Sequence, residues 1–341
     1  MKVAVYYSNS DVRLEERPVP RIAAGEILVR MMSSGICGTD VMQWYRQKKP
    51  PRVLGHEMAG EIIEAGVGVE KFKTGERVFV SHHVPCYDCR YCDEGNYTAC
   101  EALHTGNYEP GGFSEYIRVP GANVKYGTFL LPDEMRYEDA AMIEPLACVV
   151  QGQKQLKLEK RHTVLIIGSG ISGLLHIQLA KLIGATVVAT DINVYRLNKA
   201  LEFGADYVFH AEKYSEDVLK KVNRGQLAER VIVCAGAKQA VDAAVASVDR
   251  MGRILFFAVP EGDISIPSMR FWRDEIAVDF SYGAAPGDLQ EALELINNGR
   301  VNVGKMITHV LPLSDIGKAF KLVSEAERSL KVVIVPDAVH T

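Results

Sequence analysis

The sequence predicts an α/β fold in which a β-rich part is joined to a doubly wound parallel sheet. Residues 1–150 contain short β-type runs that glycine and proline interrupt, and they show little helical periodicity. From His162 onward, apolar runs typical of buried strands alternate with amphipathic segments typical of helices. This alternation indicates a parallel sheet with helices on both faces.

About six strands are expected in that sheet. In chain order they cover residues 162–168, 186–191, 206–210, 230–236, 252–259 and 277–282. Helical patterns lie between the strands, for example at 171–185, 193–205 and 239–249. The order of strand and helix is that of repeated βαβ units.

The end of the chain follows a different sequence pattern. A helix is expected at 288–299, and a β-like tail follows it at 303–313 and 330–336. Because the tail resembles the first part more than the second, we expect it to return there. The expected domains are 1–147, 148–288 and, as a return to the first domain, 289–341.

The composition is that of an ordinary globular protein of about two domains, with 341 residues, 48% hydrophobic and 24% charged. A net charge of −4 and the lack of a long basic stripe disfavour nucleic acid as a partner. The apolar runs are too short to span a membrane. Seven cysteines without an export signal indicate a cytoplasmic protein.

A dinucleotide-binding motif follows the first strand of the expected sheet. The run Gly168-Ser-Gly170-Ile-Ser-Gly173 opens a helix directly after that strand. The glycines permit a tight turn, the approach of a pyrophosphate, and close packing of helix on strand. The residues predicted to bind the cofactor here are Gly168, Gly170, Ile171, Ser172 and Gly173.

Asp191, at the end of the next strand, is expected to bind the adenosine ribose hydroxyls. A carboxylate there repels a 2′-phosphate, which favours NAD over NADP, although the nearby Arg196 could accommodate that phosphate. The alternative is that Asp191 caps the following helix. Tyr282, at the end of the last strand, is a further candidate for cofactor binding.

Four cysteines, Cys86, Cys89, Cys92 and Cys100, are separated by two, two and seven residues. This spacing predicts a structural zinc site with an all-sulfur cage, and Fe–S ligation is the alternative. A disulfide ladder is less consistent with this segment because no signal peptide is recognised in the sequence. A thioredoxin-like motif needs only one Cys-x-x-Cys, whereas here a third cysteine repeats the spacing and a fourth follows. A closed site leaves no open position for substrate, so the chemistry must lie elsewhere.

A second set of candidate ligands consists of Cys37, His56, Glu57 and Glu144. Mixed sulfur, nitrogen and oxygen donors suit zinc in a catalytic role. By spacing alone, however, a histidine beside a glutamate is more often a hydrogen-bonded pair than a pair of ligands. His82 and His83 precede the cysteine tetrad, and we interpret them as structural because neighbours on a strand point to opposite faces.

Three motifs together resemble the zinc-containing medium-chain alcohol dehydrogenases. They are the run Gly55-His-Glu-x2-Gly60-x5-Gly66-x2-Val69, the segment GGFSEY at 111–116, and the cysteine tetrad. The similarity covers nearly the whole chain and is greatest to the sorbitol (polyol) and threonine dehydrogenase branch. It implies a GroES-like catalytic domain, a Rossmann domain, NAD-linked oxidation of an alcohol at zinc, and a homodimer or homotetramer.

The resemblance also implies roles for individual residues. Cys37, His56 and Glu57 look like ligands of a catalytic zinc, with Glu144 as a direct or water-mediated fourth ligand. Cys148 is the alternative fourth ligand. The second zinc implied per chain is that of the tetrad.

Near the catalytic zinc, Thr39 is expected to relay the proton, or else to be a simple turn hydroxyl. Asp40 is expected to orient His56. Two residues depart from the pattern of the branch. Met42 stands where many members have histidine, which weakens threonine as the substrate, and Ser281 stands where sorbitol dehydrogenases have arginine.

The resulting hypothesis is hydride transfer between NAD and a secondary alcohol or ketone of a polyol or sugar-like substrate. Four cations in segment 44–52 suggest a sugar phosphate, as in galactitol-phosphate dehydrogenases, but a solvated basic loop is the simpler interpretation. A zinc-free quinone reductase and a zinc-ribbon module that only senses dinucleotide are the remaining alternatives. The intact cysteine, histidine and glutamate set argues against both.

Overall fold

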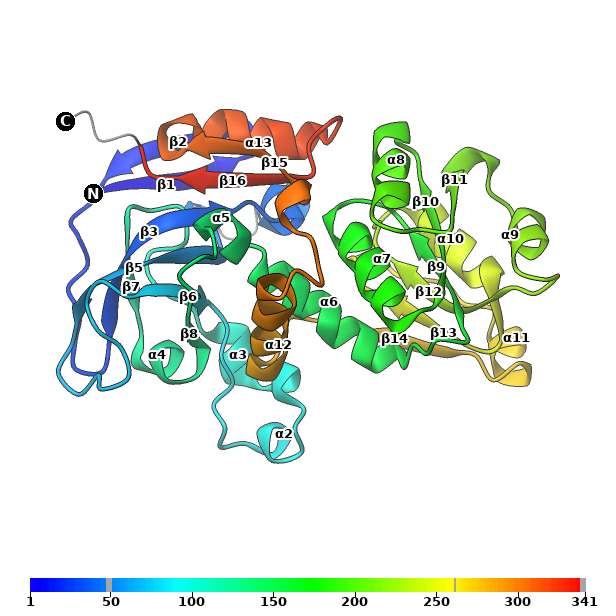
Figure 1. Ribbon diagram of the computed structural model, residues 1–341, viewed down its shortest axis with the longest axis horizontal. Helices are drawn as coiled ribbons and strands as arrows, with labels where there is room; N and C mark the ends of the chain where they lie inside the picture. The colour runs from blue at the N-terminus through cyan, green and yellow to red at the C-terminus, as the bar shows by residue number, and fades with distance from the viewer. Residues whose placement is uncertain (47–50, 261, 338–341) are drawn as a thin grey trace. The chain divides into compact units, whose positions relative to one another are not determined.

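The computed structural model describes residues 1–46, 51–260 and 262–337. The chain forms two compact units (Figure 1). The first comprises Met1–Ala147 and Ala284–Thr341, and the second comprises Cys148–Gly283. The return to the first unit therefore begins before helix α12 (Pro286–Asn297), whereas the expected boundary at residue 288 falls inside that helix.

The first unit is built on two sheets. The larger has the order β15-β16-β3-β5-β6-β8, with β7 beside β3, and the smaller has the order β2-β1-β4. Their strands are β1 (Lys2–Ser8), β2 (Asp11–Glu16), β3 (Ile27–Gly35), β4 (Arg52–Val53), β5 (Glu57–Ala65), β6 (Arg77–Ser81), β7 (Tyr116–Val119), β8 (Thr128–Leu130), β15 (Ile307–Pro312) and β16 (Lys331–Val335).

The tail strand β16 joins the two ends of the chain within this unit. It pairs antiparallel with β3, with Val333 opposite Gly35 and Ile334 opposite Ser34, and parallel with β15. Its residues are almost all buried, as a central strand requires.

Short helices connect these strands. They are η1 (Gly38–Val41), α1 (Gln43–Arg46), α2 (Arg90–Asp93), η2 (Tyr97–Ala99), α3 (Glu101–Thr105), α4 (Gly121–Gly127), α5 (Tyr137–Ala140), η4 (Gly304–Met306) and η5 (Leu313–Asp315). Longer helices are α12 and α13 (Ile316–Glu325), while α6 (Ile143–Leu156) begins here and continues into the second unit.

Helix α13 lies in the tail, which was expected to be β-like. Its buried residues Ile316, Ala319 and Phe320 follow helical spacing. The ring of Phe320 contacts Tyr6 and Phe113 in the main core of the first unit, at centroid distances of 5.8 Å each. The helix is thus held by packing against a core formed mostly by the N-terminal half of the chain.

The second unit is a six-stranded parallel sheet in the order β11-β10-β9-β12-β13-β14. The strands are β9 (Thr163–Ile167), β10 (Thr186–Asp191), β11 (Tyr207–His210), β12 (Ala228–Val233), β13 (Val248–Phe256) and β14 (Ala277–Phe280). Each falls within or overlaps a segment expected to be a strand. The predicted fold class is therefore confirmed.

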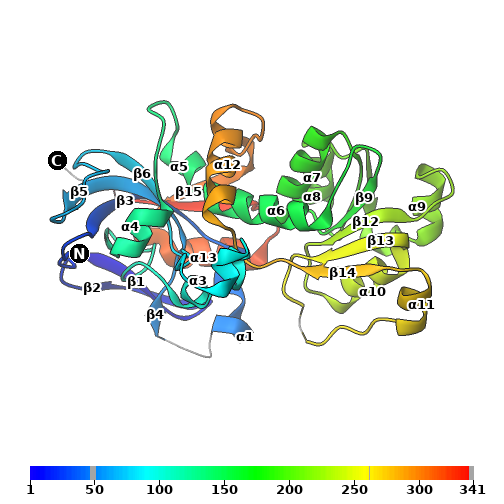
Figure 2. The same ribbon diagram turned by 90° about the horizontal axis from the view of Figure 1, so that it is seen from below.

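Helices cover both faces of this sheet. They are α7 (Ile171–Ile183), α8 (Val194–Glu202), η3 (Ala211–Lys213), α9 (Glu216–Val222), α10 (Lys238–Ser247) and α11 (Ser268–Arg273). Figure 2 shows α7 and α8 on one face and α10 on the other. The strand order reverses between β9 and β12, and ligands of such sheets bind beyond the carboxyl ends of the strands at this point.

Among the described residues, we find no helix with the length and apolar character that crossing a membrane requires.

Candidate active site and metal centres

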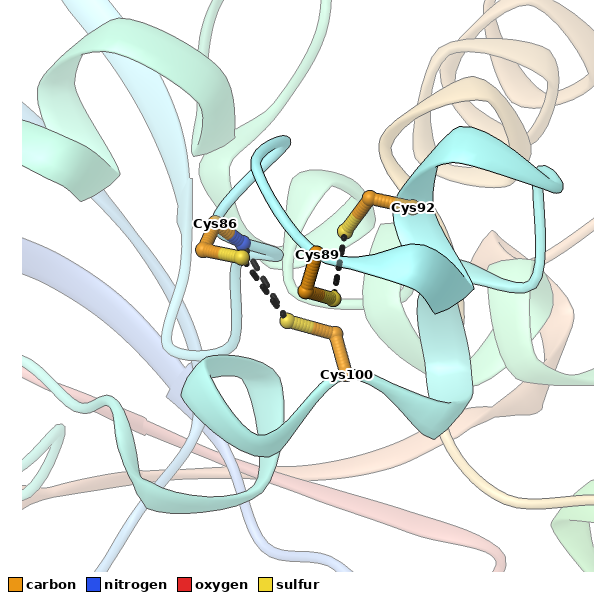
Figure 3. A group of neighbouring side chains, drawn as sticks. All are labelled: Cys86, Cys89, Cys92 and Cys100. Carbon is orange, nitrogen blue, oxygen red and sulfur yellow. Dashed lines mark hydrogen bonds between the residues drawn. The ribbon is translucent and has the colours of Figure 1, made fainter.

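The four cysteines of the tetrad converge on one point in a loop of the first unit (Figure 3). Cys89 and Cys100 precede the short helices α2 and α3 as their N-cap residues, so each thiol lies at the start of a turn. All four sulfur atoms lie within 4.8 Å of one another, and the Cys89–Cys92 and Cys86–Cys100 pairs are 3.6 and 3.5 Å apart. A tetrahedral zinc site places its sulfurs about 3.8 Å apart, so the geometry fits.

The environment of the tetrad also suits a cation. Burial raises the pKa of Cys92 to about 12. Burial acts in the same direction on Cys100, but backbone amides, led by that of Cys86, outweigh it and lower its pKa to about 6. Without a cation the four thiols therefore cannot all ionise, whereas a divalent metal would neutralise the thiolates. The apolar cluster of this loop is small, with Leu103 as its largest buried member.

The second candidate cluster brings together Cys37, His56 and Glu57. One potential ligand atom of each lies within 4.8 Å of the others. Cys37 is the N-cap of η1, and His56 and Glu57 lie where the chain enters β5. Donors that are far apart in the sequence thus meet at the ends of β3 and β5, which are paired strands.

Asp40 lies beneath this cluster and is fully buried. Its carboxylate accepts from the backbone amide of Cys37 at 3.1 Å and lies 3.6 Å from Nδ1 of His56. Burial alone would lower the pKa of His56, but Asp40 and Cys37 raise it to about 10. The imidazole therefore stands in a strongly negative environment, as a cation site requires.

Glu57 has a partner that the sequence pattern did not indicate. Lys331, the first residue of β16, donates to the Oε2 atom of Glu57 and, at 3.3 Å, to the carbonyl of Ile36. Both charged side chains are at least 98% buried. No motif marks this lysine, because its role depends on a contact between residues 274 positions apart.

Glu144 lies in the first turn of α6 and is near the cluster without belonging to it. Its charge also helps to raise the pKa of His56, but it contributes less than Asp40 and Cys37 do. It is thus placed beside the three donors rather than among them. The alternative ligand Cys148 belongs to the second unit.

Thr39 is held between a cation and a thiol. Its hydroxyl donates to Sγ of Cys37 at 3.3 Å and accepts from Arg46 at 3.0 Å. Arg46 also donates to the backbone carbonyl of Thr39 and forms an ion pair with Asp40 at 3.2 Å. With a side chain 14% exposed, Arg46 is not the solvated cation that we expected.

The remaining cations of the basic segment differ in their placement. Arg52 is partly buried and donates to the backbone carbonyl of Arg46 at 3.0 Å. Lys48 and Lys49 lie outside the described residues. Trp44 and Tyr45 are both more than 40% exposed, so neither is buried in a core.

The interpretation of His82 and His83 as neighbours on opposite faces of a strand is wrong. Strand β6 ends at Ser81, and the chain then turns, so the two rings lie 3.6 Å apart. The ring of His82 is also 5.0 Å from that of His56. Burial lowers the pKa of His82 well below its usual value, and the adjacent imidazoles act in the same direction, which keeps the ring neutral.

In the second unit, the glycine motif forms the turn between β9 and α7. Gly168 has a φ of +96°, which favours glycine, and a Cβ at Gly173 would clash with the carbonyl oxygen of Gly168. A Cβ at Gly170 would meet only a terminal nitrogen of Arg196, at 4.0 Å. The space over this turn fits a pyrophosphate at the N-terminus of α7.

Asp191 is fixed beside the same turn. Its carboxylate accepts from the backbone amides of Ser169 at 2.7 Å and Asn193 at 2.8 Å. The N-cap of α8 is Asn193, so the alternative that Asp191 caps this helix is wrong. Tyr282 follows β14 and is 47% exposed.

Comparison with known proteins identifies the family. Residues 23–128 match the alcohol dehydrogenase GroES-like domain, and residues 172–298 match the zinc-binding dehydrogenase domain. The sorbitol dehydrogenase of Bacillus subtilis is 30% identical over 99% of this chain and 98% of its own length. The chain belongs to the zinc-containing medium-chain alcohol dehydrogenase family. It is therefore a dehydrogenase with zinc and NAD as its cofactors, and a dinucleotide-sensing module or a zinc-free reductase is not supported.

Two other members of this family are similar over nearly their whole length. The D-arabitol-phosphate dehydrogenase of Enterococcus avium is 34% identical over 93% of this chain and 91% of its own. The crystal structure of galactitol-1-phosphate dehydrogenase from Escherichia coli superposes with a TM-score of 0.88 at 28% identity, covering 98% of this chain and 100% of the other.

The tetrad geometry generates a first prediction. Replacing Cys89 with Ser should remove one zinc per chain and lower the melting temperature, while the folded enzyme keeps its hydride transfer. Metal analysis, thermal unfolding and NADH absorbance would measure this. Cys37→Ser is the matched comparison, because it should abolish hydride transfer with little loss of stability. A Cys89→Ser enzyme of normal stability without activity would contradict the assignment.

The buried ion pair generates a second prediction. Lys331→Met leaves Glu57 as an uncompensated buried carboxylate and should lower the free energy of unfolding by about 3–5 kcal/mol. Adding Glu57→Gln should recover part of that loss, because the buried charge is then removed. Denaturant unfolding of the two single variants and the double variant measures the coupling. Additive effects would show that the pair contributes no interaction energy.

Proposed function

We propose that this chain oxidises a secondary alcohol of a polyol or sugar-like compound with NAD, and reduces the corresponding ketone in the reverse direction. The observation that carries the proposal is the cluster of Cys37, His56 and Glu57. A thiolate, an imidazole and a carboxylate form a donor set suited to catalytic zinc with an open position. The similarity to sorbitol and D-arabitol-phosphate dehydrogenases supports the polyol class.

When bound, zinc supplies a Lewis acid that lowers the pKa of an alcohol, and NAD accepts the hydride. Cys37, His56 and Glu57 would hold the metal, and Glu144 is close enough to approach it as a further ligand. Thr39 would accept the proton of the substrate hydroxyl while it releases its own hydroxyl proton to water, for which its hydroxyl must turn away from Cys37.

We propose that the glycine turn binds the pyrophosphate of NAD and that Asp191 binds the adenosine ribose. Two backbone amides hold the carboxylate of Asp191 beside the glycine turn, and a negative charge on it would repel a 2′-phosphate. This favours NAD over NADP. Arg196 and Tyr282 would contact the dinucleotide from the edges of the site.

We assign the tetrad to a structural zinc. Its four thiols must stay reduced in order to bind the metal, which favours a cytoplasmic location. The site supports a loop with little apolar core of its own, so its metal should serve the fold rather than the reaction.

A phosphorylated polyol is the second candidate substrate. Two similar proteins act on phosphorylated sugar alcohols by name. In this chain, Nε of Arg52 is buried without a hydrogen-bond partner among the described residues, beside the guanidinium of Arg46. A phosphate could accept from such a pair of guanidinium groups.

The proposed activity is tested by a substrate screen. Purified enzyme with zinc should reduce NAD, and NADP more slowly, with at least one C4 to C6 polyol or its phosphate. Comparing each free polyol with its phosphate separates the two candidate substrates, since no preference for phosphate removes the second. Activity that survives complete removal of both metals would contradict the zinc mechanism.

We further propose a homodimer or homotetramer formed through the edge strand β14. This strand ends the parallel sheet, and Phe280 on it is 59% exposed. Met269 and Trp272 on the preceding helix α11 are at least 74% exposed. Light scattering should give a mass of two or four chains, and Phe280→Lys should reduce it. A wild-type monomer at micromolar concentration would contradict the proposal.

A further inference from the structure

Tyr108 is a buried tyrosine of the first unit that lies near the candidate metal cluster. The side chain is 1% exposed, and its Oη atom has no hydrogen-bond partner among the described residues. Buried polar groups of folded proteins are nearly always paired, because an unpaired one loses its hydrogen bonds to water. An unpaired phenol next to a catalytic site therefore indicates a partner that arrives from outside.

The position of Tyr108 is defined by a chain of neighbouring rings. The ring of Tyr108 lies edge-on to that of His82 at 6.4 Å, and His82 lies 5.0 Å from the candidate ligand His56. All three residues belong to the first unit. The unpaired phenol is thus one ring away from the proposed metal ligands.

Electrostatics agree with this placement. Burial raises the pKa of Tyr108 well above its usual value, and the carboxylates of Glu144, Glu57 and Asp40 act in the same direction. The hydroxyl is consequently a hydrogen-bond donor at every physiological pH. It lies within electrostatic reach of the carboxylates that surround the candidate metal cluster.

A second polar atom that could bind a ligand lies on His82. Its Nδ1 is buried and has no hydrogen-bond partner among the described residues, while the ring is hydrogen-bonded to the backbone of His56. A donor on Tyr108 and a nitrogen on His82 therefore stand on adjacent rings. A hydroxyl group can serve both, since it accepts from one and donates to the other.

We propose that Tyr108, with His82 beside it, binds a second hydroxyl group of the substrate, on the carbon next to the one that is oxidised. The inference rests on the proposed polyol function and deepens it. In this chain, Tyr108 and His82 would recognise the second hydroxyl group of the substrate, a role that we do not assign to Met42 or Ser281. The enzyme should therefore prefer vicinal diols to simple secondary alcohols.

The matched substrates 2,3-butanediol and 2-butanol, which differ by one hydroxyl group, test this. Tyr108→Phe should raise KM for the diol about tenfold, the worth of one hydrogen bond of roughly 1.4 kcal/mol, and leave KM for 2-butanol unchanged. Calorimetric binding of the diol without dinucleotide should weaken by a similar factor. Tyr108→Phe should also keep or raise the melting temperature, because the unpaired hydroxyl is removed.

Tyr214→Phe is the control. Tyr214 is a partly buried tyrosine of the second unit whose hydroxyl donates to Ser247 at 2.8 Å. Its loss should lower the melting temperature without changing the preference between the two alcohols. If Tyr108→Phe instead lowers the melting temperature and affects both alcohols equally, the hydroxyl is structural and the inference fails. If the wild-type enzyme oxidises no alcohol, this result contradicts the proposed function itself, on which the inference about Tyr108 rests.

Discussion

The buried ion pair between Glu57 and Lys331 is the constraint on which the catalytic unit depends. Two charges without access to water are tolerated only when they meet in good geometry, and either alone is strongly unfavourable. Lys331 can reach Glu57 only if β16 pairs with β3 in its observed register. The position of Glu57 at the start of β5 is therefore coupled to the correct return of the chain from the second unit.

The ion pair of Glu57 and Lys331 is also part of the charge balance around the candidate metal cluster. When Cys37 is ionised, the cluster and its surroundings carry four negative charges, on Cys37, Asp40, Glu57 and Glu144. Lys331 forms an ion pair with Glu57, and Arg46 forms one with Asp40. A divalent cation would compensate the negative charges of Cys37 and Glu144, which is a physical reason why these residues suit zinc together. The lysine thus compensates charge that the metal alone would leave unbalanced.

Local patterns were enough to predict the fold class, the glycine turn and the convergence of the four cysteines, because each motif lies within one short segment of the chain. The set of Cys37, His56 and Glu57 was predicted from the family resemblance, because its spacing alone does not distinguish ligands from a hydrogen-bonded pair. Lys331 and Tyr108 carry no such signal, because only tertiary packing brings them near Glu57 and His82.

Errors of prediction arose where an element ended or where packing decided its state. The two adjacent histidines were placed on a strand that in fact stops at Ser81, and the change of direction there brings their rings together. Helix α13 was missed because its apolar spacing is short and lies between two strands of the tail. One cue was present in the sequence, since Ile316, Ala319 and Phe320 are spaced as one face of a helix.

The environment of Thr39 restricts how a proton can leave the active site. A histidine at position 42 could accept a proton from the threonine hydroxyl, but Met42 cannot, and Arg46 occupies that hydroxyl instead. A guanidinium remains protonated throughout the physiological range, so it can hold Thr39 in place but cannot carry a proton away. In the proposed relay, the proton would therefore pass from Thr39 to water. Arg46 thus orients the hydroxyl and adds a positive charge that favours the deprotonated state of a nearby alcohol.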